Sequence, residues 1–124
     1  MVSDNIPGGS NKRGLHRYYL IYYLRVFDRD SGQILGHLVD INTNGLMIIR
    51  DSVIEVGTVY NLRLRWRSSS GRLTVADIEG TCRWCRPDVN PDFYGAGFAI
   101  TSGSEENIKA IKELIGDLSI QDKT

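Results

Sequence analysis

The stretch His37–Ile49, which reads H-L-V-D-I-N-T-N-G-L-M-I-I, decides the fold because its pattern is that of a β-hairpin. Residues 38–41 and 46–49 are mainly apolar and β-prone, which is typical of paired strands. Asn44 and Gly45 stand between them, and an Asn-Gly pair supplies the positive φ angles that a tight hairpin turn needs. The sequence therefore predicts two antiparallel strands joined by a short turn.

Three polar side chains stand at the corner of this hairpin: Asp40, Asn42 and Thr43. One interpretation is structural, because Asp and Asn in turns commonly bond neighbouring backbone N–H groups. The other interpretation is that the corner binds a ligand. Arg13 and Arg17 favour the second interpretation, because they form an R-x-x-x-R pair just ahead of the first predicted strand, with 22 residues between Arg17 and Asp40.

The order R-x-x-x-R followed by D-x-S-x-x-G resembles the signature of PilZ domains, which are bacterial receptors for the second messenger cyclic di-GMP. Here the second half reads D-I-N-T-N-G, so Asp40 and Gly45 match, while Asn42 stands where the family usually has serine. The chain contains three R-x-x-x-R pairs, and only Arg13/Arg17 has the family's place before the first strand. The resemblance extends to about residue 100 and includes the late strand Y-G-A-G-F-A-I.

The resemblance implies a ligand-binding role for each matching residue. Arginine suits cyclic di-GMP because a guanidinium bonds bidentately to phosphate or to guanine O6 and N7, and also stacks on a base. By resemblance, Arg13 and Arg17 would hold a phosphate and a guanine Hoogsteen edge. Asp40 would accept guanine N–H bonds, Asn42 would lie near a phosphate or base edge, and Gly45 would let the backbone approach the ligand.

The segment C-R-W-C-R places Cys82, Trp84 and Cys85 on a later predicted strand. We expect Trp84 to be a core residue first and a stacking platform for the second base, as in some PilZ domains, second. In an extended strand the two cysteines would point to opposite faces about 10 Å apart, which is beyond disulfide reach. Only His16 and His37 remain as further nitrogen ligands, so no zinc site is predicted.

Six segments with the composition of β-strands are separated by turn residues. We expect strands at 18–28, 33–40, 46–50, 58–67, 73–86 and 93–100. In 58–67, apolar residues at even positions alternate with polar residues at odd positions, which indicates a strand with one solvated face. Gly80 predicts a bulge or bend. The whole pattern predicts a mainly β fold, a six-stranded antiparallel β-barrel like that of PilZ domains.

A C-terminal α-helix follows the last strand, because the apolar period changes after residue 102. Ser102 and Glu105 fit a capping box, and Gly116 is a candidate for the helix end. The apolar stripe consists of Ile108, Ile111, Leu114, Ile115 and Leu118. We expect this stripe to pack on the barrel, with an oligomer contact as the alternative.

The chain length of 124 residues fits one domain. We assign residues 1–12 to a flexible N-terminal tail, 13–118 to the barrel domain with its C-terminal helix, and 119–124 to a C-terminal tail. The longest apolar run, 18–24, falls well short of the roughly 20 residues that cross a bilayer, and the N-terminus lacks the pattern of a secretory signal. We therefore expect a bacterial cytoplasmic protein without membrane contact.

The charge pattern favours a small anionic ligand over a long polyanion. Basic and acidic residues both total 15, so the net charge is zero, yet residues 61–86 hold six arginines against two acids. No P-loop, H-E-x-x-H or G-x-S-x-G motif occurs. The chain is therefore not predicted to be an enzyme, and neither a metal nor a cofactor is expected.

These patterns together predict a cyclic di-GMP receptor that passes ligand occupancy to a downstream protein partner, as a monomer or a weak homodimer. One alternative is a degenerate PilZ-like interaction module without nucleotide binding, which Asn42 in place of serine supports. Another is a small barrel that binds single-stranded nucleic acid through Arg63, Arg65 and Arg67, although we expect no nucleic-acid partner. Direct titration with cyclic di-GMP separates the three.

Overall fold

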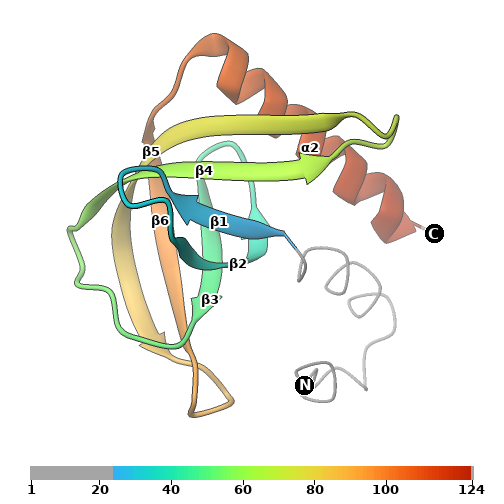
Figure 1. Ribbon diagram of the computed structural model, residues 1–124. Helices are drawn as coiled ribbons and strands as arrows, with labels where there is room; N and C mark the ends of the chain where they lie inside the picture. Colours follow the sequence, from blue (N-terminus) through green and yellow to red (C-terminus); the bar gives the residue numbers. More distant parts are fainter. Residues whose placement is uncertain (1–23, 124) are drawn as a thin grey trace.

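A computed structural model describes residues 24–123, with side chains up to residue 118. The elements, shown in Figure 1, are β1 (Arg25–Asp28), β2 (Ile34–Ile41), β3 (Gly45–Arg50), β4 (Val59–Arg67), β5 (Leu73–Pro87), β6 (Tyr94–Ser102) and α2 (Glu105–Lys123). The strands form a closed barrel in the order β1-β2-β3-β6-β5-β4, and every pairing is antiparallel. The predicted six-stranded barrel with a C-terminal helix is confirmed. The part of the first predicted strand that precedes residue 24 lies outside the described residues.

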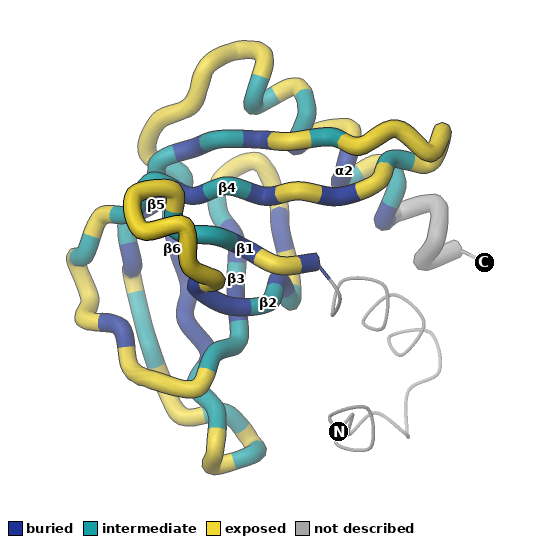
Figure 2. The backbone as a smooth tube through the Cα atoms, in the orientation of Figure 1, coloured by how far each residue is buried: buried dark blue, intermediate teal, exposed yellow. Residues whose placement is uncertain are grey.

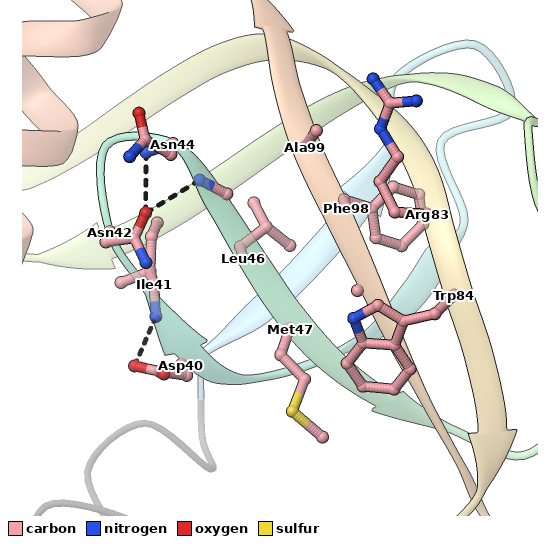
Figure 3. Close-up of a pocket in the computed structure, with 12 residues that line it drawn as sticks. Asp40, Ile41, Asn42, Asn44, Leu46, Met47, Arg83, Trp84, Phe98 and Ala99 are labelled. Atoms are coloured by element: carbon pink, nitrogen blue, oxygen red, sulfur yellow. Dashed lines mark hydrogen bonds between the residues drawn. The ribbon is translucent and has the colours of Figure 1, made fainter.

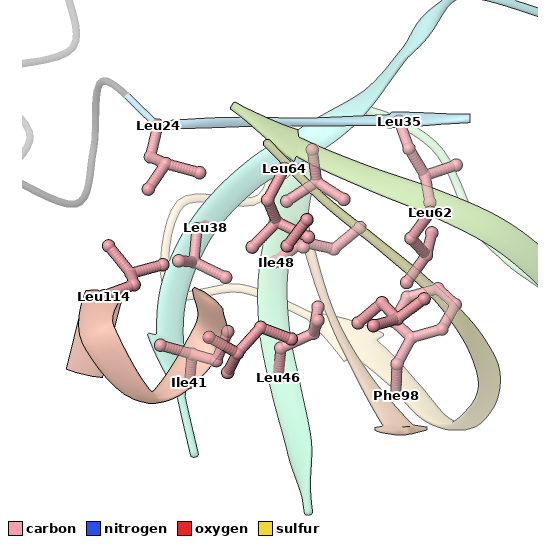
Figure 4. Packing of buried hydrophobic residues seen from close by; sticks show 14 of the residues in the cluster. Leu24, Leu35, Leu38, Ile41, Leu46, Ile48, Leu62, Leu64, Phe98 and Leu114 are labelled. Carbon is pink, nitrogen blue, oxygen red and sulfur yellow. The ribbon is translucent and has the colours of Figure 1, made fainter. Parts of the chain in front are cut away.

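The barrel interior is filled by alternate side chains of the strands, as period-two patterning requires. On β4, Leu62 and Leu64 are fully buried and Trp66 is 8% exposed, while the residues between them face outward. Figure 4 shows the side chains of several strands meeting in the centre, with α2 closing one end of the barrel through Leu114. The alternation predicted for 58–67 is therefore confirmed.

The hairpin between β4 and β5 turns where the sequence predicts it, at residues 68–71. The N–H of Gly71 donates to Ser68 O at 2.8 Å, and Gly71 has a φ of 88°. This angle is strained for any residue with a Cβ. Beyond the barrel, the two strands continue as a projecting arm that is exposed at its tip (Figure 2).

Helix α2 begins later and ends later than the sequence predicts. Its N-terminal cap is Ser104, whose Oγ accepts a hydrogen bond from the N–H of Asn107 at 3.2 Å, so the capping box at Ser102 is wrong. The helix also continues through Gly116 to Lys123 and includes residues 119–123, which we had assigned to a tail. Burial explains the continuation, because Leu118 beyond the glycine is only 3% exposed. The predicted packing of the helix on the barrel is confirmed.

Strand β5 contains two register shifts, which change the facing of its residues. The first, between Glu79 and Gly80, confirms the bulge predicted at Gly80. The second lies between Cys82 and Trp84 and reverses the alternation. As a result, Cys82 is buried and Cys85 also packs against the core, so the expectation that the two cysteines face opposite sides is wrong.

Burial changes the chemistry of Cys82. It raises the pKa of the Cys82 thiol, and the neighbouring Cys85 raises it further, so the thiol form is favoured.

Within residues 24–123, no helix is long and apolar enough to cross a bilayer.

Candidate functional site

The turn between β2 and β3 is built by the side chain of Asn42. The side-chain Oδ1 accepts hydrogen bonds from the backbone N–H groups of Asn44 at 2.7 Å and Gly45 at 3.0 Å. The backbone N–H of Asn42 donates to Gly45 O at 2.9 Å. This arrangement is an Asx turn. The predicted positive φ angles at Asn44 and Gly45 are wrong, because neither residue has one. The hydrogen bonds to the side chain of Asn42, and not positive φ angles in the Asn-Gly pair, stabilise the turn.

Gly45 is needed for the close approach of β3 to β6. A Cβ added there would lie only 2.5 Å from the carbonyl oxygen of Phe98, a backbone atom that cannot turn aside. The resemblance implied that Gly45 admits the backbone to a ligand. In the structure, the approach that excludes a side chain is between two strands of the barrel.

Asp40 lies at the end of β2, beside the turn, and its side chain is exposed. A register shift between Leu38 and Asp40 disturbs the pairing with β3 at this point, and such bulges redirect a side chain. One carboxylate oxygen, Oδ1, accepts a hydrogen bond from the N–H of Ile41 at 2.9 Å. The carboxylate therefore stands at the rim of the turn.

A hollow of about 380 Å³ lies beside this turn (Figure 3). Three segments line it: residues 40–42 and 44–47 of the β2–β3 hairpin, Arg83 and Trp84 of β5, and residues 97–99 of β6. Four residues predicted for the site, Asp40, Asn42, Gly45 and Trp84, thus line one hollow although Trp84 is far away in sequence. The barrel brings them together because β6 pairs with both β3 and β5.

Trp84 lies outside the barrel, so its predicted place in the core is wrong. It is half-buried, and its indole rests against β6, where a Cβ added at Gly97 would collide with Nε1 of the ring. The register shift after Cys82 causes this outward orientation. The guanidinium of Arg86 lies over the same ring, with Cζ 4.5 Å from the ring centroid. This arrangement is a cation–π contact.

Arg83 lines the hollow but was not among the predicted site residues. Its side chain is exposed, and in Figure 3 its guanidinium points away from the ring of Trp84. In a regular strand, adjacent residues point to opposite faces, so a platform at Trp84 would have excluded Arg83. The register shift allows both to line the same hollow, and a basic residue next to the tryptophan was the available signal.

Arg63, Arg65 and Arg67 form the outward side of β4, which we call the arginine face. Arg63 makes two hydrogen bonds with the carboxylate of Asp77, at 2.7 and 2.9 Å. Arg65 places Cζ 4.5 Å from the ring centroid of Phe27. Each of these arginines thus has a partner inside the protein, because Arg67 bonds to the backbone of the β4–β5 turn.

The ion pair between Arg63 and Asp77 shifts the pKa values of both side chains. Hydrogen bonding to Arg63 holds the pKa of Asp77 below its ordinary value, and Arg29, 3.8 Å from the carboxylate, contributes in the same direction. The same bond raises the pKa of Arg63. These shifts are the signature of a structural ion pair rather than of a free anion site.

Two of the predicted site residues, Arg13 and Arg17, lie outside the described residues. Among residues 24–118, no three His, Cys, Asp or Glu side chains gather in a way that could hold a metal ion. The candidate site in the described part of the chain therefore consists of the hollow and its rim.

Comparisons with known proteins give the fold and the family. The solved structure of the Bacillus subtilis inhibitor of motility, MotI/DgrA, matches with a TM-score of 0.65 at 9% sequence identity, over 82% of this chain and 48% of that chain. The present chain thus corresponds to about half of that protein. A comparison with curated proteins gives no match. The PilZ domain model matches residues 11–117, and PilZ domains are non-catalytic receptor modules for cyclic di-GMP. The chain therefore belongs to the PilZ domain family.

Proposed function

We propose that this protein binds cyclic di-GMP at the hollow beside the β2–β3 turn and reports its occupancy to a protein partner. One observation carries the proposal: the polar corner of the hairpin and the Arg83–Trp84 pair of β5 line the same hollow. A carboxylate, an amide, a guanidinium and an aromatic ring around one opening are the groups that a guanine nucleotide needs. Membership of the PilZ family supports the same ligand.

The roles follow from complementary charge and hydrogen bonding. Cyclic di-GMP is a dianion, so arginines are the natural partners of its phosphates. We assign Arg13 and Arg17 to a phosphate and a guanine Hoogsteen edge. We assign Asp40 to the N–H groups of guanine, because a carboxylate only accepts hydrogen bonds.

Asn42 is suited to donate to the ligand. Its Oδ1 already accepts two backbone N–H groups of the turn, and no residue of the described part of the chain accepts a hydrogen bond from its Nδ2. The amide is therefore fixed with its oxygen toward the turn, which leaves its NH₂ group for a phosphate oxygen or a base edge. In this way an asparagine can take over the donor function of the serine that is usual in the family.

Arg83 and Trp84 would meet the second base. One face of the indole rests on β6 at Gly97, and Arg86 lies over the ring. A base that stacks on Trp84 must therefore displace the guanidinium of Arg86 or join its stack. Arg83, which is exposed at the rim, adds positive charge where a phosphate would lie.

Reporting to a partner needs a surface that changes with ligand. Arg13 and Arg17 are separated in sequence from the hollow, so binding through both would bring the N-terminal segment to the hairpin. A partner that recognises this arrangement would bind only the liganded form, which is a shift between two states.

Calorimetric titration with cyclic di-GMP tests the proposal, with GMP as the control ligand. We expect saturable binding of cyclic di-GMP and much weaker binding of GMP. Amide chemical shifts should then change around Asn42, Arg83 and Trp84. Absence of binding, or shifts confined to the arginine face, would refute the placement of the ligand.

The second candidate function is a degenerate PilZ module that binds a protein and no nucleotide. The observation that favours it is again Asn42, which serves the turn with its side-chain oxygen. If this is its entire role, wild type fails to bind cyclic di-GMP in the same titration. Recovery of binding in Asn42→Ser would then identify the loss of serine as the cause.

A further inference from the structure

Within residues 24–123, the N-terminal half of β5 has an edge without a neighbouring strand. β5 pairs with β4 along residues 73–81, but with β6 only from Glu79 onward. Residues 73–78 therefore belong to the projecting arm and have a strand on one side only. In Figure 1 no strand lies along the outer edge of this part of β5, and α2 passes behind the arm.

The orientation of the backbone shows which groups are available at this edge. The N–H of Asp77 donates to Oδ1 of helix residue Asn107 at 2.9 Å, so it points away from β4. Because the backbone of successive residues points to alternate sides of a strand, Leu73 and Val75 direct their N–H and C=O groups to the same open edge. Within the described residues these groups have no hydrogen-bond partner.

The side chains at the open edge are apolar and exposed. The exposed fraction is 60% for Leu73 and 38% for Val75. Natural edge strands are usually protected from pairing by charged residues, proline or bulges. Here the register is regular from Arg67–Leu73 to Val59–Thr81, and the two outward residues at the edge carry no charge. The edge is therefore in a condition to pair with another strand.

The surroundings of the edge are basic. Arg65 is the cross-strand neighbour of Val75 and Arg67 that of Leu73, and Arg72 is exposed at the end of the arm. Asp77 and Glu79 are the acids on this face of β5, and both have partners, since Arg63 bonds to Asp77 and Thr101 donates to Glu79. Asp117 of α2 lies at the tip of the arm, where it accepts a hydrogen bond from the N–H of Ser69. An acidic segment is therefore attracted to the edge, whereas a second copy of the chain would bring two sets of arginines together.

We propose that the open edge of β5 binds an extended acidic segment of a partner protein as an added strand. Main-chain hydrogen bonds to Leu73 and Val75 would provide the pairing, and the arginines beside them would select acidic side chains. The inference is independent of the proposed nucleotide site, which uses the other half of β5 at Arg83 and Trp84. The edge would bind an acidic protein segment, whereas the hollow would bind the nucleotide.

The experiment uses a seven-residue peptide that alternates valine with glutamate, and a matched peptide with lysine in place of glutamate. Amide exchange of the full chain is measured by NMR, alone and with each peptide. With the acidic peptide at saturation we expect exchange at Leu73 and Val75 to slow by about tenfold or more. The lysine peptide should leave both rates unchanged.

Two variants control for the mode of binding. Val75→Pro removes the edge N–H, and proline is tolerated at strand edges. Val75→Glu keeps the backbone and places a negative charge against the glutamates of the acidic peptide, so it remains informative if the proline variant does not fold. Loss of peptide protection in Val75→Glu, with unchanged melting temperature, supports the proposal. Unchanged protection in this variant overturns it.

Three other results would also overturn the proposal. The first is equal protection by the acidic and lysine peptides. The second is protection by the acidic peptide at the hollow instead of at Leu73 and Val75. The third is protection of these two amides without peptide that grows with protein concentration, because that result would assign the edge to a second copy of the chain.

Discussion

The hollow and the arginine face are both polar regions of the same barrel, and they differ in what their side chains already bind. On the arginine face, Arg63 is paired with Asp77, Arg65 lies on Phe27, and Arg67 bonds to the β4–β5 turn. At the hollow, neither the amide NH₂ of Asn42 nor the exposed side chain of Arg83 has a hydrogen-bond partner within the described residues. The difference teaches that a row of arginines does not by itself mark the nucleotide site, because here each arginine of the row already has a partner in the protein.

The physical reason is the cost of exchanging partners. A ligand phosphate that takes Arg63 must leave the carboxylate of Asp77 without its bidentate partner, and this loss opposes binding. A phosphate that binds Asn42 and Arg83 would break no hydrogen bond between described residues. The following predictions test this contrast, beginning with the largest expected effect.

Arg17→Ala should weaken cyclic di-GMP binding most strongly. Loss of a hydrogen bond to a charged group costs about 1.5–3 kcal/mol, which is roughly 10- to 100-fold in Kd. The matched control is Arg65→Ala, which removes the same charge from the arginine face and should leave Kd nearly unchanged. Calorimetry measures both. Equal weakening by the two variants would mean that total charge, and not the hollow, determines binding.

Gly45→Ala should destabilise the hairpin that carries the hollow. The added Cβ lies against the Phe98 carbonyl oxygen, and an overpacked contact of this kind costs about 1–3 kcal/mol of unfolding free energy. Gly116→Ala is the control, because a Cβ there meets no neighbour within 4 Å and an alanine in a helix is favoured over glycine by about 1 kcal/mol. Urea unfolding should shift in opposite directions for the two variants. A stable Gly45→Ala protein would show that β3 and β6 can separate at this point.

Asn42→Ala should lower both stability and affinity, because the turn loses its Oδ1 acceptor and the ligand loses the NH₂ donor. We expect about 0.5–1.5 kcal/mol for each neutral hydrogen bond. Asn42→Ser restores a shorter acceptor and a donor, so it should bind cyclic di-GMP at least as well as wild type. Thermal melting and calorimetry on the same samples separate the two roles. A loss of melting temperature with unchanged Kd would limit Asn42 to the turn.

Acid should produce the smallest effect, in two pH ranges. Burial, with Arg25 nearby, lowers the pKa of His37 from its ordinary value of 6.5, so below about pH 6.5 the unfolded chain binds more protons and stability falls. The pKa of Asp77 is lowered from 3.8, so a further loss follows as the pH drops below that value. Urea midpoints measured from pH 7.5 to pH 3 follow both. His37→Gln should remove the first decrease and Asp77→Asn the second.

A binding test with a variant of the ion pair completes the contrast. Because Asp77 belongs to the arginine face, Asp77→Asn should leave the cyclic di-GMP affinity at the hollow nearly unchanged. If Asp77→Asn changes the affinity at pH 7, the released Arg63 has become a ligand for the nucleotide. Such a result would break the distinction between the two regions.

Periodicity alone was sufficient for the barrel and for the helix that closes it. The alternation in 58–67 and the stripe from Ile108 to Leu118 follow from the geometry of strands and helices, so both were confirmed. Capping was less predictable, because Ser102 and Ser104 have equal capping chemistry and only packing decides where the first helical turn forms. The same applies to Gly116, whose cost in the helix is offset by the burial of Leu118.

The candidate site was predictable in part. Asp40, Asn42 and Gly45 could be named because they are close in sequence within a recognisable hairpin, and the structure places them at one hollow. Trp84 was named but expected in the core, and Arg83 was not named. Both errors have one cause, the register shift after Cys82, since a bulge depends on how β5 pairs with β6 and leaves no reliable pattern in a single strand.

The amino-acid sequence by itself determined the number of strands, the solvated and buried faces of a regular strand such as 58–67, and the polar corner of the hairpin, because these depend on local spacing. The tertiary structure decided which polar groups remain available. It paired Arg63 with Asp77, placed Trp84 on the outside at Gly97, and left the edge of β5 open at Val75. These outcomes depend on contacts between segments far apart in the chain, and the free energy of such contacts cannot be read from spacing alone.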